Sequence, residues 1–273
     1  MPELPEVEVV KREINKSLEN RIIKRFDIRF PKLREEVSKE LYSLENLKVL
    51  KVDRRAKYII IETDKGCILI HLGMSGVISI VSSEIPVKKH DHVDILLDDN
   101  VIIRLNDPRR FGLFKWFKDL IELNNYKGIK KLGVEPLSDD FTAQYLKEKL
   151  SKKSTVDIKT SLLNQEVVVG IGNIYASEIL YEVGISPLRN SCDVSLDECE
   201  KIVQVTRAIL QKSIQMGGTT IKDFSDAHGH IGAYVNSLKI YGHQGEKCGK
   251  CGSIIEKIVI KGRSTYCCPH CQK

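Results

Sequence analysis

Four cysteines near the C-terminus are spaced as two close pairs. Two residues separate Cys248 from Cys251, sixteen residues follow, and Cys268 and Cys271 form the second pair. Two such pairs supply four thiolates, the donor set of a closed tetrahedral zinc site. Because no coordination position stays open, such a zinc is structural and not catalytic. The spacing therefore predicts one structural Zn²⁺.

The segment between the two cysteine pairs has the pattern of a β-hairpin. Ser253–Ile260 and Ser264–Cys267 alternate, with a turn expected at Lys261-Gly262-Arg263. A short hairpin is marginally stable alone, so the metal would supply most of its folding energy. Arg263 is expected at the tip, where its guanidinium could bind a phosphate. Two alternatives stay open, namely Cys267 as a competing ligand and a pair of disulfides in place of zinc.

The second residue offers a different chemistry. Pro2 follows the initiator methionine, which is generally removed before a small second residue, so the chain would begin with a secondary amine. An α-amino group has a pKa of about 8, so part of it is unprotonated at neutral pH. A secondary amine attacking a sugar C1′ can pass directly to an iminium ion, and Glu3 and Glu6 could move the protons. Most second-position prolines have no such role, so the position alone does not decide.

Composition limits the compartment. The chain has 273 residues, of which 42% are hydrophobic and 29% charged. No apolar run reaches the roughly 18 residues that a membrane span needs. The acidic, amphipathic N-terminus lacks a secretory pattern. We therefore expect a cytoplasmic protein with reduced thiols and no membrane partner.

Positive charge gathers at the C-terminus. The net charge is +6, and residues 239–273 carry seven basic and two acidic residues, a net +5. A basic module on a nearly neutral body indicates a polyanionic partner. A merely solvated tail is the alternative.

The periodicity of the sequence predicts an α+β fold. Apolar residues at three- and four-residue steps predict a helix over 4–18, with Pro5 in its first turn. Short Val- and Ile-rich segments separated by turn residues then predict an antiparallel β-sandwich or barrel. The predicted strands are Arg21–Phe30, Leu47–Val52, Tyr58–Thr63, Cys67–Leu72, Val77–Val81, His92–Leu97 and Val101–Leu105.

After about residue 135 the pattern becomes helical. Ser195 and Glu198 have capping-box spacing at the start of the longest helix, and Gly217 follows its end. Gly217–Ala233 is expected to be a mobile loop. The predicted helices are Phe141–Leu150, Ile158–Leu163, Asn173–Val183 and Ser195–Met216, and the predicted domains are 1–135, 136–234 and 235–273.

The first residues, MPELPEV, resemble the start of the formamidopyrimidine-DNA glycosylases, bacterial enzymes that remove oxidised purines such as 8-oxoguanine. Further motifs of that family follow in the family's order over the whole chain. They are RRAKY (54–58), HLGMSG (71–76), KHDHV (89–93), NDPRRFG (106–112), LGVEPL (132–137), GIGNIYASE (170–178), GGTT (217–220) and the four-cysteine hairpin with its KGR turn.

The resemblance implies an architecture and an activity. It implies an N-terminal antiparallel β-sandwich flanked by helices, a helix–two-turn–helix domain and a C-terminal zinc hairpin, with DNA across the cleft between two lobes. It also implies a monomeric base-excision repair enzyme. Such an enzyme removes 8-oxoguanine and formamidopyrimidines from double-stranded DNA and cuts abasic sites by β,δ-elimination.

The resemblance also implies catalytic roles. Pro2 resembles the nucleophile that forms the Schiff base, and Glu3 resembles the acid–base residue that helps to open the sugar ring. Lys57 resembles the family's lysine that contacts a phosphate and transfers a proton during β-elimination. Arg263 resembles the family's arginine that binds a phosphate and takes part in δ-elimination. Glu6 is expected to support the site beside the DNA.

Further residues are expected to bind DNA. An extruded base costs a few kcal/mol of stacking and leaves a void. Met74, Arg109 and Phe111 resemble the family's three void-filling residues, although core packing would be the usual role of Met74 and Phe111. Further phosphate contacts are expected from Asn173 at a helix N-terminus and from His90, Arg110, Lys153 and Lys159. For His71 and His92, a buried hydrogen-bonded histidine is an equal alternative to DNA contact.

Three positions depart from the family pattern. They are Val9 in place of threonine, Asn164 in place of aspartate and His243 in place of arginine. Two other functions remain to be separated. The first is an endonuclease VIII-like glycosylase for oxidised pyrimidines, which Leu4 and Val7 disfavour. The second is a non-catalytic zinc-dependent protein that binds damaged DNA.

Overall fold

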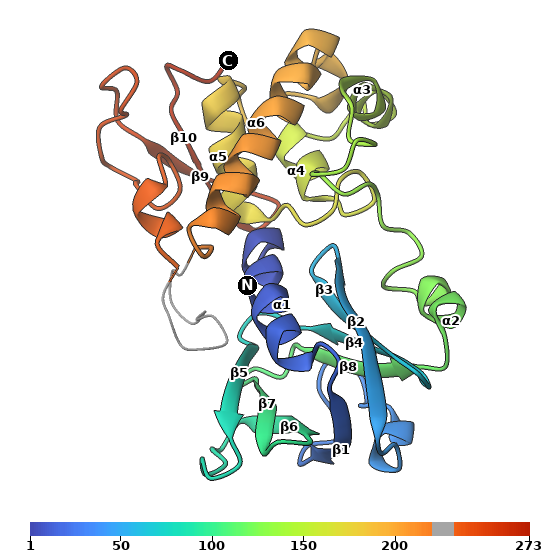
Figure 1. Ribbon diagram of the computed structural model, residues 1–273. Coiled ribbons are helices and arrows are strands. Elements are labelled where there is room, and N and C mark those ends of the chain that lie inside the picture. The colour runs from blue at the N-terminus through green and yellow to red at the C-terminus, as the bar shows by residue number, and fades with distance from the viewer. Residues whose placement is uncertain (220–231) are drawn as a thin grey trace. The chain divides into compact units, whose positions relative to one another are not determined.

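The computed structural model describes residues 1–219 and 232–273 (Figure 1). The chain divides into two compact units, the first formed by residues 1–130 and 216–235 and the second by residues 131–215 and 236–273. Of the loop expected at 217–233, residues 220–231 lie outside the described residues. Within the described ranges, no helix is both long and apolar enough to cross a membrane.

Helix α1 (Leu4–Leu18) opens the first unit and has the predicted bounds. Its apolar residues Leu4, Val10 and Ile14 are fully buried, as their spacing requires. A capping box closes the N-terminus, because the carboxylate of Glu6 accepts a hydrogen bond from the backbone N–H of Glu3 and the side chain of Glu3 accepts one in return. The capping box therefore fixes the backbone at the first turn of α1.

Eight antiparallel strands follow, in the order β5-β7-β6-β1-β2-β3-β4-β8. They form two four-stranded halves that are joined through the pairing of β1 with β2, at Ile22 with Lys48 and Ile23 with Leu47. The predicted sandwich is confirmed, with an eighth strand that the sequence pattern did not predict. The strands are β1 (Ile22–Ile28), β2 (Leu47–Arg55), β3 (Tyr58–Thr63), β4 (Gly66–His71), β5 (Val77–Ser82), β6 (Asp91–Leu97), β7 (Val101–Asn106) and β8 (Leu113–Phe117).

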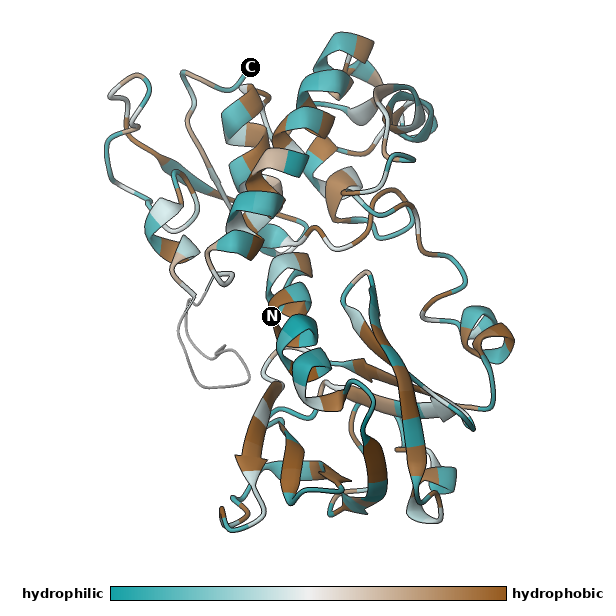
Figure 2. Cartoon of the chain, in the orientation of Figure 1, coloured by the Kyte–Doolittle hydropathy of each residue, from teal (hydrophilic) through white to brown (hydrophobic). Residues whose placement is uncertain are grey.

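One hydrophobic core serves both halves of the sheet and α1. It joins Val10 and Ile14 of the helix to Ile61 and Ile70 of one half and to Ile95 of the other. Figure 2 shows hydrophobic residues along much of these strands. This core fixes the segments that follow β2, β4 and β7, which carry most of the predicted site residues of the unit. Two short helices, η1 (Lys39–Tyr42) and α2 (Leu120–Asn125), complete the unit.

The second unit is mainly helical. Helix α5 (Asn173–Val183) has the predicted bounds and ends at Gly184, which adopts the left-handed conformation with φ +79°. At the start of α6, Ser195 and Glu198 form both bonds of the predicted capping box. The remaining elements are α3 (Ala143–Ser151), α4 (Ile158–Leu163), η2 (Ser191–Asp193) and α6 (Leu196–Gln215). The short helix η3 (Tyr234–Ser237) spans the sequence boundary at which the chain passes from the first unit to the second.

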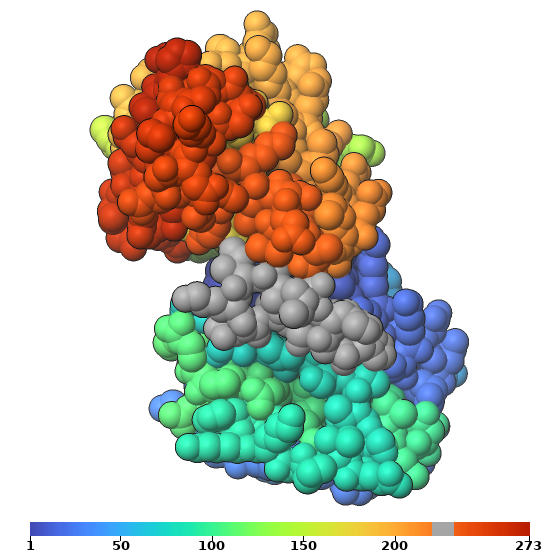
Figure 3. Space-filling model, turned by 90° about the vertical axis from the view of Figure 1, so that its left-hand side faces the viewer, coloured from blue at the N-terminus to red at the C-terminus, as the bar shows by residue number. Residues whose placement is uncertain are grey.

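A two-stranded hairpin closes the second unit. Strands β9 (Glu256–Ile260) and β10 (Arg263–Cys267) pair from Ile260 with Arg263 to Glu256 with Cys267. The turn has two residues, Lys261 and Gly262, both with positive φ, as in a type I′ turn. Arg263 is therefore the first residue of β10 and not part of the turn as predicted. Figure 3 shows the C-terminal residues, in orange to red, as one continuous patch of surface.

Candidate active site and zinc centre

The start of α1 holds Pro2 and Glu3 in place. Pro2 is buried, and Glu3 and Glu6 are 3% and 1% exposed. One carboxylate oxygen of Glu6 accepts from the backbone N–H of Glu3 at 2.8 Å, and the other accepts from that of Thr219 at 2.8 Å. Glu6 was expected to support the site beside the DNA; it is buried, and these two bonds hold its carboxylate against the backbone.

Lys57 follows β2 in a tight bend. The residue before it, Ala56, has a positive φ of 54°. Arg54 holds this bend, because its guanidinium donates to the carbonyl of Ala56 at 2.8 Å and to the carboxylate of Glu8 at 2.9 Å. Burial raises the pKa of Glu8, but hydrogen bonds from Arg54 and Arg12 outweigh it and lower the pKa overall. The positions of Arg54 and Glu8 beside the bend at Lys57 were not predicted from the sequence.

His71 lies at the end of β4 and is held neutral. Its Nδ1 accepts a hydrogen bond from the backbone N–H of Gly73 at 2.9 Å, and its ring lies 4.7 Å from that of Tyr58. Burial, together with the positive charges of Arg34 and Lys57, lowers the pKa of His71 to about 3. A neutral ring with Nδ1 as acceptor carries its proton on Nε2.

The three expected void-filling residues are all exposed. Met74 is 42% and Phe111 44% exposed, and Arg109 is also exposed. The guanidinium carbon of Arg109 lies 5.1 Å from the ring centre of Phe111, a cation–π distance. Core packing is therefore not the role of Met74 and Phe111, and their large side chains face solvent.

A buried aspartate, Asp107, holds the two loops that present these residues. It is 0% exposed and accepts from the hydroxyl of Ser75 at 2.6 Å and from the backbone N–H of Gly112 at 2.7 Å. The hydroxyl of Ser75 in turn accepts from the backbone N–H of Arg109 at 3.1 Å. The loops touch closely, since a Cβ on Gly73 would lie 2.4 Å from the carbonyl carbon of Phe111. Asp107 was not predicted, although it stands inside the NDPRRFG motif.

The remaining expected contacts of the first unit surround Asp107. Arg110 is exposed and has a positive φ of 56°, and its guanidinium lies 4.7 Å from the ring centre of Phe30. His90 is half-buried, with its ring 6.2 Å from that of His92. His92 is buried and its Nε2 lies 3.0 Å from the carbonyl oxygen of Asp107, so of its two alternatives the structure favours the hydrogen-bonded histidine.

In the second unit, helices α4 and α5 contact the two residues that follow Arg263. The side-chain amide of Asn173 donates to the carbonyl of Ser264 at 2.8 Å. Lys159 donates to the hydroxyl of Thr265 at 2.6 Å and is 0% exposed. A lysine so buried is not available to a phosphate, so the expectation for Lys159 is wrong and its ammonium group supports β10 instead. Arg263 itself is exposed, and Lys153 is half-buried.

The four predicted cysteines come together. The sulfur atoms of Cys248, Cys251, Cys268 and Cys271 all lie within 4.8 Å of one another. Two of the separations are 3.8 Å and 3.5 Å. A tetrahedral zinc with bonds of about 2.3 Å requires sulfur atoms about 3.8 Å apart, so this set fits the metal. Every cysteine is free, which rules out the disulfide alternative, and Cys267 is not part of the cluster.

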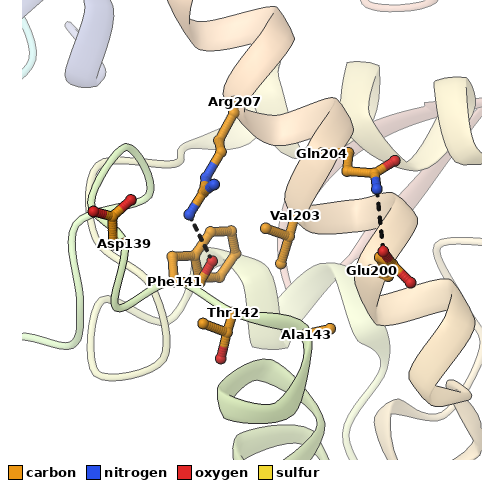
Figure 4. A pocket seen from close by; sticks show the side chains of 8 residues that line it. All are labelled: Asp139, Phe141, Thr142, Ala143, Glu200, Val203, Gln204 and Arg207. Carbon is orange, nitrogen blue, oxygen red and sulfur yellow. Dashed lines mark hydrogen bonds between the residues drawn. The ribbon is translucent and has the colours of Figure 1, made fainter.

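A hollow of about 320 Å³ lies between the start of α3 and α6 (Figure 4). Its polar groups are largely paired within the protein, since Gln204 donates to Glu200 and Arg207 donates to the carbonyls of Ser138 and Phe141. None of the predicted site residues lines it. The hollow is therefore separate from the candidate site.

Models of three domains match the chain along its length. They are the formamidopyrimidine-DNA glycosylase N-terminal domain over residues 1–114, the formamidopyrimidine-DNA glycosylase H2TH domain over residues 132–225, and the zinc finger found in FPG and IleRS over residues 245–273. The chain belongs to the formamidopyrimidine-DNA glycosylase family. It is thus a DNA glycosylase and AP lyase, with one structural zinc held by the C-terminal finger.

Individual relatives agree with the domain matches. The chain is 46% identical to the formamidopyrimidine-DNA glycosylase of Haemophilus influenzae (strain PittEE), with 100% of this chain and 99% of that one covered. A relative from Escherichia coli O6:K15:H31 is also 46% identical with full coverage of both. A solved structure of a Lactococcus lactis FPG mutant with Fapy-dG containing DNA superposes with a TM-score of 0.92 at 34% identity, covering both chains fully.

Proposed function

We propose that this protein removes 8-oxoguanine and formamidopyrimidines from double-stranded DNA through a Schiff base on Pro2. Removal of Met1 converts the Pro2 nitrogen from an amide into a secondary amine. That amine attacks C1′, the glycosidic bond breaks, and the oxidised base leaves with the bonding electron pair and a proton. Cleavage of the C1′–O4′ bond, with a proton delivered to O4′, then opens the sugar ring and leaves an iminium ion between C1′ and the Pro2 nitrogen, the electron sink for strand cleavage.

Elimination from the iminium ion then cuts the strand. Loss of a C2′ proton expels the 3′-phosphate, a second elimination expels the 5′-phosphate, and hydrolysis frees Pro2. We assign to Glu3 the proton transfer that opens the sugar ring, and to Lys57 phosphate contact and proton transfer in β-elimination. Arg263 is assigned to phosphate binding and δ-elimination.

The position of the α1 N-terminus is the observation that carries this proposal. Pro2 and Glu3 are buried at a helix start that Glu6 ties to the backbone on two sides. A nucleophile must be held within a few tenths of an ångström of its attacking position, and a capped, buried helix start meets that requirement. The positive charge of Lys57, which contributes to the lowered pKa of His71, would also attract the phosphates of a DNA substrate.

We assign the exposed trio Met74, Arg109 and Phe111 to the void left by the extruded base. A flexible apolar chain and an aromatic ring can replace lost stacking, and the guanidinium can bind the orphaned partner base. Asn173, His90, Arg110 and Lys153 are proposed as contacts to the DNA backbone.

Borohydride trapping tests the assignment of Pro2. The protein is incubated with a duplex containing 8-oxoguanine, reduced, and the crosslinked peptide is mapped by mass spectrometry. We expect a crosslink at the Pro2 nitrogen, and none in a variant that keeps a residue before Pro2, although that variant should still bind the duplex. A crosslink at Lys57, or none at all in the processed protein, would overturn the assignment.

The choice of lesion is tested in the same assay. One solved structure of the Lactococcus lactis protein is of a complex with oxidised pyrimidine containing DNA. Duplexes with 8-oxoguanine and with thymine glycol should therefore be compared side by side. Faster excision of 8-oxoguanine is expected, and a preference for thymine glycol would favour the endonuclease VIII-like alternative.

We further propose that the protein acts as a monomer in the bacterial cytosol, where reduced thiols stay available to zinc. The domain boundaries at residues 135 and 234 also stand as a proposal. The division into compact units instead groups the helical segment and the zinc hairpin together.

A further inference from the structure

Helix α5 touches the zinc centre through one side chain that the catalytic proposal does not use. We infer that the hydroxyl of Tyr181 donates a hydrogen bond to the zinc-bound thiolate of Cys248 and thereby slows the release of zinc. This inference goes beyond the proposed function, because it concerns the lifetime of the metal site and not the chemistry on DNA.

The geometry identifies the donor. The hydroxyl oxygen of Tyr181 lies 3.2 Å from the sulfur of Cys248. Both residues are buried, with exposures of 1% and 3%. A zinc-bound thiolate has lost its proton and can only accept, so the proton in this contact belongs to the tyrosine. Without this acceptor the buried hydroxyl would be desolvated and unpaired, which is unfavourable, so folding favours the contact.

Packing holds the tyrosine ring in this orientation. Tyr181 forms one cluster with Ile240, Ile255 and the ligands Cys248 and Cys268. Lys250, in the loop between the first two ligands, places its ammonium group 4.7 Å from the centre of the ring and donates to the carbonyl of Tyr181 at 3.2 Å. The contacts of Lys250 therefore fix the tyrosine ring against the loop between the two ligands, with its hydroxyl directed at the sulfur of Cys248.

The contact also gives α5 a second attachment to the zinc module. Near its start, Asn173 donates to the carbonyl of Ser264, directly after Arg263. Near its end, Tyr181 reaches Cys248. The helix thus bridges the metal and the strand that carries Arg263, so the metal is held by its ligands and also by the rigid element beside them.

Helix α5 supplies its own matched control. Tyr175 lies on the same helix, is 0% exposed, and its hydroxyl lies 2.6 Å from that of Ser213. Y175F and Y181F each remove one buried hydroxyl and keep the ring, but only Y181F affects a zinc ligand. Transfer of zinc from the purified zinc-loaded protein to a chromogenic chelator measures release directly, without any DNA.

We expect Y181F to release zinc about tenfold faster than the parent protein, in the range seen when partners of metal ligands are removed, and Y175F to release it at the parent rate. With cobalt in place of zinc, the thiolate-to-metal charge-transfer band should move to lower energy in Y181F alone, because the thiolate loses a donor. Equal release rates and unshifted bands in all three proteins would overturn the inference. Faster release in both variants with unshifted bands would overturn it too, since that result indicates general loosening.

Discussion

His71 is a residue whose ionisation depends on the fold. Its pKa falls from its ordinary 6.5 to about 3, because burial and the charges of Arg34 and Lys57 oppose protonation. Below pH 6.5 the unfolded chain therefore binds a proton that the folded chain refuses, and the folded state loses stability as the pH falls. From about pH 7 to about pH 5 this one group should cost about 2 kcal/mol of unfolding free energy.

Denaturant unfolding at the two pH values measures this loss. H71Q removes the titrating ring and keeps an acceptor for the N–H of Gly73, so its stability should depend less on pH by that amount. An unchanged pH dependence in H71Q would show that other groups carry the acid sensitivity.

Glu6 supports a second prediction at the residue scale. E6Q replaces one of two carboxylate oxygens with an N–H₂ group that faces a backbone N–H, of Glu3 or of Thr219. The mismatch costs roughly 1–3 kcal/mol and should displace the helix start. We expect borohydride-trapped crosslink to form about tenfold more slowly, by the conversion of about 1.4 kcal/mol per tenfold. E19Q is the control, because Glu19 lies exposed at the other end of α1, and an equal effect in both variants would argue against a positioning role.

At the scale of elements, the loop that carries Met74 and the loop that carries Arg109 and Phe111 are both hydrogen-bonded to the buried carboxylate of Asp107, directly or through Ser75. S75A removes the hydroxyl that donates to Asp107 and accepts from the N–H of Arg109. With these groups left unpaired, the void-filling side chains should lose their fixed positions. Affinity for a duplex with an abasic site should fall about tenfold, while affinity for undamaged duplex should change little, because its intact base stack has no void for these side chains to fill. A gel-shift titration of both duplexes measures the effect, with S83A at an exposed serine as control; equal losses on the two duplexes would contradict it.

Most elements could be predicted from periodicity, and the exception has a physical reason. The ranges predicted for β3, α4 and α5 agree with the structure. Strand β8 was missed, because its sequence LFKWF lacks clean alternation; it is buried at both ends and half-buried between. Its pairing with β4 stabilises it, and a partner far away in sequence leaves no local pattern.

The site shows the same division between local and distant information. Cysteine spacing is local and predicted the metal ligands. Lys159 was expected to contact a phosphate, because its charge is visible in the sequence and its burial against Thr265, far along the chain, is not. Three supporting residues act through contacts with segments distant in sequence, so their roles could not be predicted from residue type alone. They are Asp107, Arg54 and Tyr181.

At the scale of the whole molecule, the two units should respond differently to loss of metal. The core around Cys248 and Cys268 is small and includes the ligands themselves, whereas the core of the first unit contains none of them. Zinc removal should therefore unfold the hairpin and leave the sandwich intact. Hydrogen exchange measures this: amides of β9 and β10 should exchange quickly after chelation and those of β3 and β4 should stay protected. Protection of β9 and β10 in verified metal-free protein would contradict a structural role for zinc.

The N-terminal residues carry a consequence for how the enzyme is made. Met1 is 52% exposed, but Pro2 directly after it is buried, and so is Glu3. A processing aminopeptidase needs an extended stretch of chain in its own active site, which the docked helix start does not offer. Under the proposed role of Pro2, the chain is thus synthesised as an inactive precursor. Burial of Pro2 and Glu3 therefore favours removal of Met1 while the nascent N-terminus is still undocked.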